Sequence, residues 1–395
     1  MKVVIQKYYL HIYNYFFYIA YACFMPFVGY WFSERGLSAS QIGLIFSIGP
    51  LVGLIIQPVW GMLIDYFGMT RLILLVSTFL TPWIALCYKF IDSYFPLYIL
   101  VSVFLAVFSS TIMPIVDAMT VRHAKLHSLS YGTIRVLGSI SFGLAVTLLG
   151  IVYNHIGISK MFILYIATMM FVCFLTFFIN DEEKVKKGKR KKQGLWKEII
   201  PLIKEPSFLL FLIPVFMTSI GPQMNNAFFS VYIGSFGEEM ASKLGILYAV
   251  ATLTEIPFFI FSGWFLRKFG YVFTLSFVSL AGALRWLILS LEPPFAVILF
   301  NQLFSGITYA LYISAGINYA YDISPEGMKT TAHSLFIVVY VNIAGIIASN
   351  VGGWLIELGG YTLLFQLASI MSFLGVIGFL GLGKFTSLSI LNNKQ

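Results

Sequence analysis

Apolar residues occur along this chain of 395 residues in runs of about twenty, separated by short polar stretches. A helix needs about twenty apolar residues to cross roughly 30 Å of hydrocarbon, whereas the strands of a membrane barrel give short segments of alternating polarity. The pattern therefore predicts twelve membrane-spanning helices, at roughly 8–32, 41–63, 72–89, 94–121, 132–155, 160–179, 208–234, 244–265, 272–291, 294–322, 329–356 and 361–383.

Composition supports an all-α membrane protein. Hydrophobic residues make up 59% of the chain and charged residues only 10%, against about 25% charged residues in soluble domains. The net charge of +9 does not indicate a nucleic-acid partner, because the basic residues gather in short loops between spans. The three cysteines, Cys23, Cys87 and Cys173, lie inside apolar runs, where we expect them to pack as small core residues rather than to form disulfides or bind a metal.

The distribution of lysine and arginine predicts the orientation in the membrane. The loops on one side, with the two ends of the chain, carry Lys2, Lys7, Arg71, Arg122, Lys125, Arg267, Lys268, Lys329, Lys384 and Lys394. The loops on the other side carry Arg35, Lys89, Lys160 and Lys243. Because basic loops stay on the cytoplasmic side, both termini are predicted to be cytoplasmic in a multi-pass protein of the cell membrane.

The chain is predicted to consist of two homologous halves. Residues 181–206 form a basic stretch that cannot enter the bilayer and is expected to be a cytoplasmic linker. It separates an N-terminal six-helix bundle, 1–180, from a C-terminal one, 207–395. At a constant offset of 202 positions, Gly43 matches Gly245, Gly61 matches Gly263, Phe67 matches Phe269 and Gly68 matches Gly270. Two parallel repeats with a substrate site between them are a known transporter architecture.

The loop after the second predicted span carries a motif. Gly61, Leu63, Asp65, Gly68 and Arg71 match the pattern G-x-L-x-D-x-x-G-x-x-R, and the chain thereby resembles the major facilitator superfamily. The resemblance implies a loop that latches one end of a transporter and gates its rocking. Gly61 is expected to let two helices approach closely, Asp65 to meet a helix N-terminus or a basic residue, Gly68 to make the turn, and Arg71 to mark the cytoplasmic edge.

Further segments are similar to one branch of that superfamily, which holds the lactose and phenylpropionate permeases. These segments are 24–27, 43–46, 57–61, 113–118 and 131–138. The resemblance implies proton symport, and it does not specify the solute.

Four charged residues fall well inside predicted spans: Asp117, Arg135, Glu255 and Arg285. An ionised group costs several kcal/mol at the bilayer centre unless it is paired or hydrated, so these residues are expected to face an interior cavity. The alternative is that they form buried pairs that hold helices together, although such pairs contribute little net stability.

The family resemblance implies that Asp117 and Arg135 bind the solute. A carboxylate accepts hydrogen bonds from hydroxyl groups, and a guanidinium donates a rigid fork to oxygens. Phe142 follows Arg135 by two helical turns, where lactose permease has an aromatic residue that stacks on the sugar. It is Phe rather than Trp, so a weaker sugar platform, a different ring or ordinary packing are all open.

Glu255 is the predicted proton carrier, because a partly dry cavity disfavours the charged form of a carboxyl group. Arg285 is expected to favour proton release by stabilising the anion, and the resemblance supports both positions. The stretch 302–309 lacks the histidine and acid that lactose permease uses for proton coupling. Glu255 or Asp117 then carries the proton alone, or the protein is a facilitator, or another ion couples.

Uncharged amides also fall in predicted spans, and Asn14, Gln223, Asn225 and Asn226 are the candidates for lining the solute path. Amides in membrane helices often simply bond neighbouring helices.

Other functional classes lack support in the sequence. It contains no Walker loop, no clustered His and Cys ligands and no Ser-His-Asp signature, so we expect neither an enzyme nor a cofactor or metal. The predicted function is secondary active transport of a small polar organic solute, such as a sugar, nucleoside or aromatic acid, with proton symport, by a monomer in the lipid bilayer. The alternatives are a proton-coupled exporter of amphipathic compounds and a non-transporting sensor.

Overall fold

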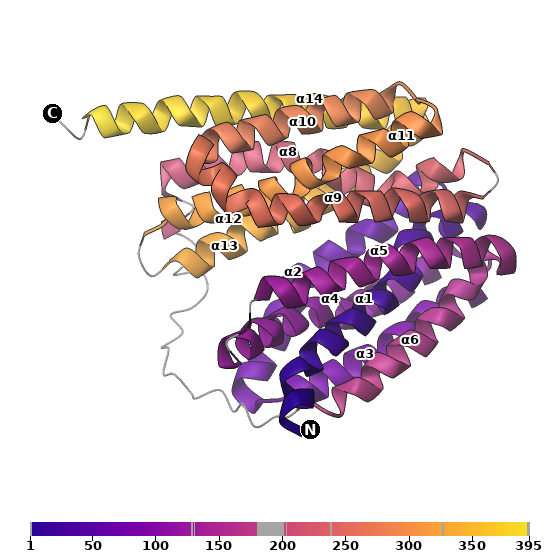
Figure 1. Ribbon diagram of the computed structural model, residues 1–395. Coiled ribbons are helices and arrows are strands. Elements are labelled where there is room, and N and C mark those ends of the chain that lie inside the picture. Colours follow the sequence, from indigo (N-terminus) through magenta and orange to yellow (C-terminus); the bar gives the residue numbers. More distant parts are fainter. Residues whose placement is uncertain are drawn as a thin grey trace. The chain divides into compact units, whose positions relative to one another are not determined.

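The computed structural model describes residues 2–127, 129, 131–179, 201–202, 204–237, 239–325 and 328–392. Helices dominate these residues, and no strand occurs among them, which confirms the predicted all-α fold (Figure 1). Most of the predicted linker, 181–206, lies outside the described residues.

The described chain forms two compact units. The first contains the residues up to 179 and Ser230–Leu253, and the second contains residues 201–229 and those from Thr254 onward. Two helices, α8 (Pro206–Gly234) and α9 (Met240–Phe269), therefore contribute to both units. The boundaries predicted from the sequence repeat, 1–180 and 207–395, stay a prediction.

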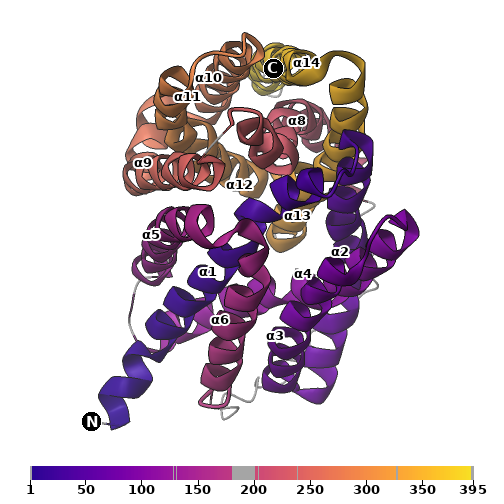
Figure 2. The ribbon, with the colours of Figure 1, turned by 90° about the vertical axis from the view of Figure 1, so that its right-hand side faces the viewer.

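The first unit contains the first six predicted spans as helices. They are α1 (Lys2–Glu34), α2 (Ala39–Phe67), α3 (Thr70–Cys87), α4 (Phe95–Leu126), α5 (Tyr131–Ile156) and α6 (Met161–Thr176), with short 3₁₀ turns at η1 (Tyr88–Phe90) and η2 (Ile158–Lys160). Helix α1 packs against α5 and α6, while α4 packs against α2 and α3 (Figure 2). Local signals set the helix ends: Ser38 and Gln41 form a capping box at the start of α2.

The second unit contains parts of α8 and α9 and the remaining predicted spans, two of which are irregular. After α10 (Tyr271–Ser290), one span consists of α11 (Phe295–Asn301), the 3₁₀ turn η3 (Gln302–Phe304), the π-helical segment η4 (Ile307–Leu311) and α12 (Tyr312–Ile323). The next consists of α13 (Lys329–Ile337), the π-helical segment η5 (Val338–Ile343) and the first part of α14 (Ala344–Asn392). Helices α10 and α14 lie side by side (Figure 1).

The helical stretches of the described chain account for the twelve predicted spans, because the last stretch contains two of them. Eleven helical stretches in the described chain are long and apolar enough to cross a membrane, and the last, Lys329–Lys384, has 56 residues. Within it, Gly359 and Gly360 break the helix, and Gly360 has a φ of 72°, which glycine adopts without steric cost. This break falls between the predicted spans 329–356 and 361–383.

Small residues let α5 and the first half of α9 pack closely in the first unit. A Cβ atom on Gly150 would collide with the carbonyl oxygen of Ala241, and one on Gly245 would lie 2.7 Å from that of Val146. Thr147 donates a hydrogen bond of 3.3 Å to the carbonyl oxygen of Gly245. Close backbone approach through glycine is a common way to pack helices in lipid, where no hydrophobic force drives them together.

We predict that Gly150→Ala destabilises the protein in spite of alanine's higher helix propensity. The added methyl group would meet the Ala241 carbonyl, and overpacking of this kind costs roughly 1–3 kcal/mol. Thermal unfolding of the detergent-purified protein should show a lower Tm.

Gly381→Ala is the matched control, because nothing described lies within 4 Å of a Cβ atom at that position in α14. It should leave the Tm unchanged or raise it, since Gly in a helix interior costs roughly 0.5–1 kcal/mol relative to Ala. Equal effects of the two substitutions would contradict the close contact of α5 with α9.

Candidate functional site

A buried arginine organises a polar cluster in the second unit. Arg285 of α10 has only 6% of its surface exposed. Its Nη1 donates a hydrogen bond of 3.0 Å to the Thr308 hydroxyl, and its Nη2 donates one of 2.8 Å to Oε1 of Gln302. Its guanidinium also lies over the ring of Trp286, 4.9 Å from the centroid, a cation–π contact. The guanidinium is therefore fixed by neutral groups on two sides.

The residues that hold Arg285 come from the irregular helix opposite α10. Gln302 lies in the 3₁₀ turn η3, and Thr308 lies in the π-helical segment η4. Ser305 lies between them, three positions from each, in the short α-helical stretch that joins the two irregular segments. Departures from α-helical winding often occur at functional sites in helices.

Glu255 of α9 joins this cluster. Ser305 donates a long hydrogen bond of 3.5 Å to Oε1 of Glu255, and Glu255 lies close enough to Arg285 for their charges to interact. The structure thus brings together the two charged residues that the sequence assigns to the eighth and ninth spans.

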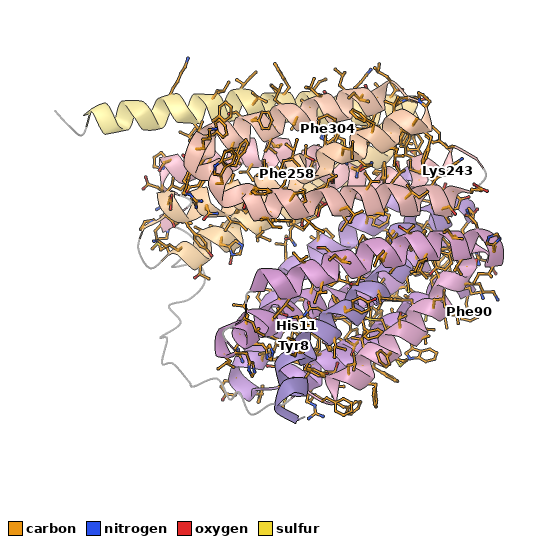
Figure 3. The ribbon with its side chains drawn as sticks, viewed as in Figure 1. Tyr8, His11, Phe90, Lys243, Phe258 and Phe304 are labelled. Carbon is orange, nitrogen blue, oxygen red and sulfur yellow. The ribbon has the colours of Figure 1, made fainter. Side chains whose placement is uncertain are left out.

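Gly306 makes the approach of α9 to the irregular helix possible. A Cβ atom on Gly306 would collide with the Thr254 carbonyl oxygen and would lie 2.5 Å from the ring of Phe258. The aromatic side chains Phe258 and Phe304 are shown in Figure 3. A larger residue at 306 would push Glu255 away from Ser305.

The predicted amides of α8 contact the second π-helical segment. Nε2 of Gln223 donates a hydrogen bond of 3.0 Å to the backbone carbonyl oxygen of Tyr340 in η5, and Asn226 donates one of 3.5 Å to Gln223. Oδ1 of Asn225 is buried and accepts no hydrogen bond from the described residues. Tyr340 also interacts electrostatically with Glu255, so Gln223 is linked to the Glu255 cluster through Tyr340.

Asn14 occupies a polar contact between α1 and α4 in the first unit. Its side chain is fully buried, with 0% exposed, and Nδ2 donates to the Leu10 carbonyl at 2.8 Å and to the Thr120 hydroxyl at 3.0 Å. Asp117 is half-buried and precedes Thr120 by one turn of α4. The described contacts of Asn14 therefore join two helices.

Histidines extend this contact toward the ends of α1 and α4. His11 interacts electrostatically with His123, and the rings of His123 and His127 are 4.3 Å apart. His11 also lies beside Tyr8, with ring centroids 5.4 Å apart (Figure 3). The sequence alone assigns no role to these histidines.

Phe142 lies between two tyrosines of the first unit. Its ring centroid is 6.1 Å from that of Tyr21 in α1 and 6.1 Å from that of Tyr248 in α9. Tyr21 is 38% exposed, and Phe142 and Tyr248 are half-buried. The three rings form a partly exposed aromatic group, which a planar or ring-shaped ligand can stack against. Arg135 lies in α5, but its side chain is outside the described residues.

The motif after α2 is built around Gly68 and Arg71. Gly68 has a φ of 68° and its N–H donates to the Ile64 carbonyl, so it makes the predicted turn. Arg71 does more than mark an edge: Nη2 donates a hydrogen bond of 2.6 Å to the Phe177 carbonyl at the end of α6. A positive charge at a helix C-terminus is favourable because carbonyl groups there lack partners.

One expectation for this motif is not met by the described residues, and another stays a prediction. Nothing described lies within 4 Å of a Cβ atom at Gly61, so the close helix approach expected there is not seen. The side chain of Asp65 is outside the described residues.

Several residues of the site were not predicted from the sequence. Thr308 and Ser305 were seen only as part of a stretch without titratable groups, and Tyr21, Tyr248 and Tyr340 were not singled out. The three-residue spacing of Gln302, Ser305 and Thr308 is a signal that could have found that row, whereas no local pattern joins the aromatic group.

Comparisons with known proteins agree with this architecture. The model of the MFS_1 like family matches residues 8–367. The "Uncharacterized transporter YwbF" of Bacillus subtilis (strain 168) is 31% identical over 346 residues, which cover 88% of this chain and 84% of that protein. Maltose permease of Geobacillus stearothermophilus is 27% identical over 369 residues, 93% and 92% of the two chains. The crystal structure of the nucleoside transporter NupG matches with a TM-score of 0.81 and 14% identity, covering 96% of this chain and 99% of that one; at this identity the likeness concerns the fold alone.

We predict that Arg71→Ala loosens the end of α6. The substitution removes a charged donor from the Phe177 carbonyl, an interaction that contributes roughly 0.3–2 kcal/mol. Hydrogen–deuterium exchange of a peptide covering 172–179 should become faster.

Arg122→Ala is the matched control, because Arg122 is exposed near the end of α4 and should leave exchange of that peptide unchanged. Unaltered exchange in Arg71→Ala would show that Arg71 does not hold the end of α6.

Proposed function

The chain belongs to the MFS_1 like family of major facilitator transporters, and from this premise we propose that it imports a small polar organic solute, a saccharide first of all, together with a proton. The bundles would present the solute site alternately to the two sides of the membrane. Both termini would be cytoplasmic, and the loop with Gly61, Asp65, Gly68 and Arg71 would gate the change of state. Like its relatives, the protein is a multi-pass membrane transporter.

The Glu255 cluster carries the proposal of proton coupling. Glu255 lies within a span, accepts a hydrogen bond from Ser305 and interacts with Arg285. A carboxyl group in such surroundings can be neutral when Arg285 is drawn away and ionised when Arg285 is near, because a nearby positive charge favours the anion. Movement of the helices can therefore couple to uptake and release of a proton.

The aromatic group supports a saccharide as the solute. Phe142 and its neighbours Tyr21 and Tyr248 offer a partly exposed platform of rings, and a sugar presents apolar faces of C–H groups to such a platform. Asp117 and Arg135 would accept from and donate to its hydroxyl groups. Maltose permease is similar to this chain over nearly its full length. Asn14, Gln223, Asn225 and Asn226 are weaker candidates, since the described hydrogen bonds of Asn14 and Gln223 join helices.

Proteoliposomes with an imposed pH gradient test this function. Acid outside should drive uphill accumulation of a radiolabelled saccharide such as maltose, and a protonophore should abolish it. Nucleosides and aromatic acids are assayed in parallel, and uptake of one of these instead would keep the mechanism and change the solute. Proton-driven efflux of dyes would indicate an exporter, and ligand binding without flux would indicate a sensor.

We predict that Glu255→Gln abolishes uphill accumulation and leaves solute exchange partly intact. A glutamine cannot carry the proton, yet it keeps the size and hydrogen-bonding capacity of the side chain. The ratio of inside to outside solute should fall to about one under a gradient that concentrates it in the wild type.

Asp92→Asn provides the control, because it neutralises an exposed acid outside the described spans and should leave accumulation unchanged. Wild-type accumulation by the Glu255→Gln variant would refute Glu255 as the proton carrier.

We predict that Phe142→Ala weakens solute binding about threefold to tenfold, because an aromatic contact contributes roughly 0.5–1.5 kcal/mol. Phe142→Trp should bind at least as tightly as the wild type. Affinity is measured by a method that does not use tryptophan fluorescence, such as equilibrium dialysis with radiolabelled solute.

Phe174→Ala serves as the comparison, since Phe174 is an exposed aromatic residue of α6. If both alanine variants bind alike, Phe142 is a packing residue.

A further inference from the structure

The guanidinium of Arg285 is shared between neutral and charged partners. Gln302 and Thr308 accept its hydrogen bonds at 2.8 and 3.0 Å, while Glu255 acts on it through charge. Gln302 and Thr308 are both buried, and neither changes its charge between pH 5 and 9. Their hold on Arg285 therefore does not vary with the pH that Glu255 responds to.

We propose that Gln302 and Thr308 are positioning residues that limit how strongly Arg285 acts on Glu255, and that they thereby set the pH at which the transporter loads its proton. The inference rests on the proposed function, in which Glu255 carries the proton. It adds two uncharged residues, on a helix without an acid or histidine at this level, to the coupling machinery.

Geometry explains why two neutral acceptors can tune a charge. Arg285 has five N–H donors in a rigid plane, so hydrogen bonds at Nη1 and Nη2 fix the whole group and not one atom alone. At an effective dielectric constant of 20, two unit charges about 4 Å apart interact by roughly 4 kcal/mol. A change of about 1 Å in their separation then changes the equilibrium constant for proton binding roughly fourfold. Small movements of the guanidinium are therefore sufficient to shift the pH at which Glu255 binds its proton.

The winding of the supporting helix fixes where these acceptors stand. Gln302 lies in a 3₁₀ turn and Thr308 in a π-helical segment, and Gly306 between them brings the Thr254 backbone of α9 close. Thr254 also donates a long hydrogen bond of 3.5 Å to the Gln302 carbonyl. The same segment thus holds Arg285 through its side chains and the Glu255 helix through its backbone.

The other titratable groups near Glu255 do not change their charge near neutral pH, where the proton uptake of Glu255 would be measured. Besides Arg285 on α10, Tyr340 of η5 interacts with Glu255, and Tyr309 of η4 and Tyr312 of α12 interact with Tyr340. Tyrosine and arginine both titrate far above neutral pH. The α8 residue that contacts this region, Gln223, is an uncharged amide.

The test measures the pH midpoint of proton-driven solute uptake in proteoliposomes. Gln302→Leu and Thr308→Val each remove one acceptor at similar volume. Arg285 is then free to be drawn toward Glu255, the anion is favoured, and the midpoint should move to lower pH by about half a unit, which corresponds to the fourfold change.

Gln302→Glu should move the midpoint in the opposite direction. A carboxylate at 302 attracts the guanidinium and adds negative charge near Glu255, so Glu255 should bind its proton at higher pH. Thr308→Ser keeps the hydroxyl group and should restore the wild-type midpoint. Should Gln302→Leu fail to fold, the pair Thr308→Val and Thr308→Ser carries the test.

Asn318→Ala is the control, because the Asn318 amide donates to the Ser314 carbonyl in its own helix and should leave the midpoint in place. Unmoved midpoints in the 302 and 308 variants, or shifts of one sign for both Leu and Glu at 302, would overturn the inference while Glu255 stays the carrier. A wild-type pH profile that Glu255→Gln does not alter would instead overturn the proposed function.

Discussion

An ionised side chain inside a membrane protein needs partners for its charge and for its hydrogen-bonding groups, because lipid supplies neither. Arg285 is the clearest case in this chain, since it lies in a span and is almost fully buried. Gln302 and Thr308 accept hydrogen bonds from its Nη2 and Nη1 atoms, and Glu255 interacts with its charge. Its Nε is buried and has no hydrogen-bond partner among the described residues. Much of the second unit's irregular backbone lies next to this cluster.

That requirement links local winding to function. The 3₁₀ turn at 302–304 and the π-helical segments at 307–311 and 338–343 alter the helical winding next to the charged group, and such departures often occur at functional sites. Gly306 and Gly245 let neighbouring backbones come close to α9 at two levels. Helix α9 thus carries the proposed proton site and contributes residues to both compact units.

Much of this could be predicted from the sequence, because lipid imposes strong rules on composition and length. The twelve spans followed from the apolar runs, the turn at Gly68 from its motif, and the association of Glu255 with Arg285 from the cost of isolated charge. The sequence indicated Phe142 as a candidate, but it did not indicate the rings beside it. Tyr21 and Tyr248 are each over a hundred positions away along the chain, and only the fold brings them next to Phe142. The neutral acceptors Gln302 and Thr308 were given no role, because uncharged groups in a span give little sign of which helix they face. Gly61 was expected at a close approach that the described residues do not show, since a glycine alone does not reveal whether it serves packing or bending.

The central claim, that Arg285 and Glu255 compensate each other inside the membrane, is tested most directly by a double-mutant cycle. The Tm of the wild type is compared with those of Arg285→Gln, Glu255→Gln and the double variant in one detergent. Compensation predicts that each single variant is destabilised by the charge left behind and that the double variant recovers much of the loss, because removing one member of a buried pair is costlier than removing both. Additive losses in the double variant would show that the two charges are stabilised independently and would contradict this account.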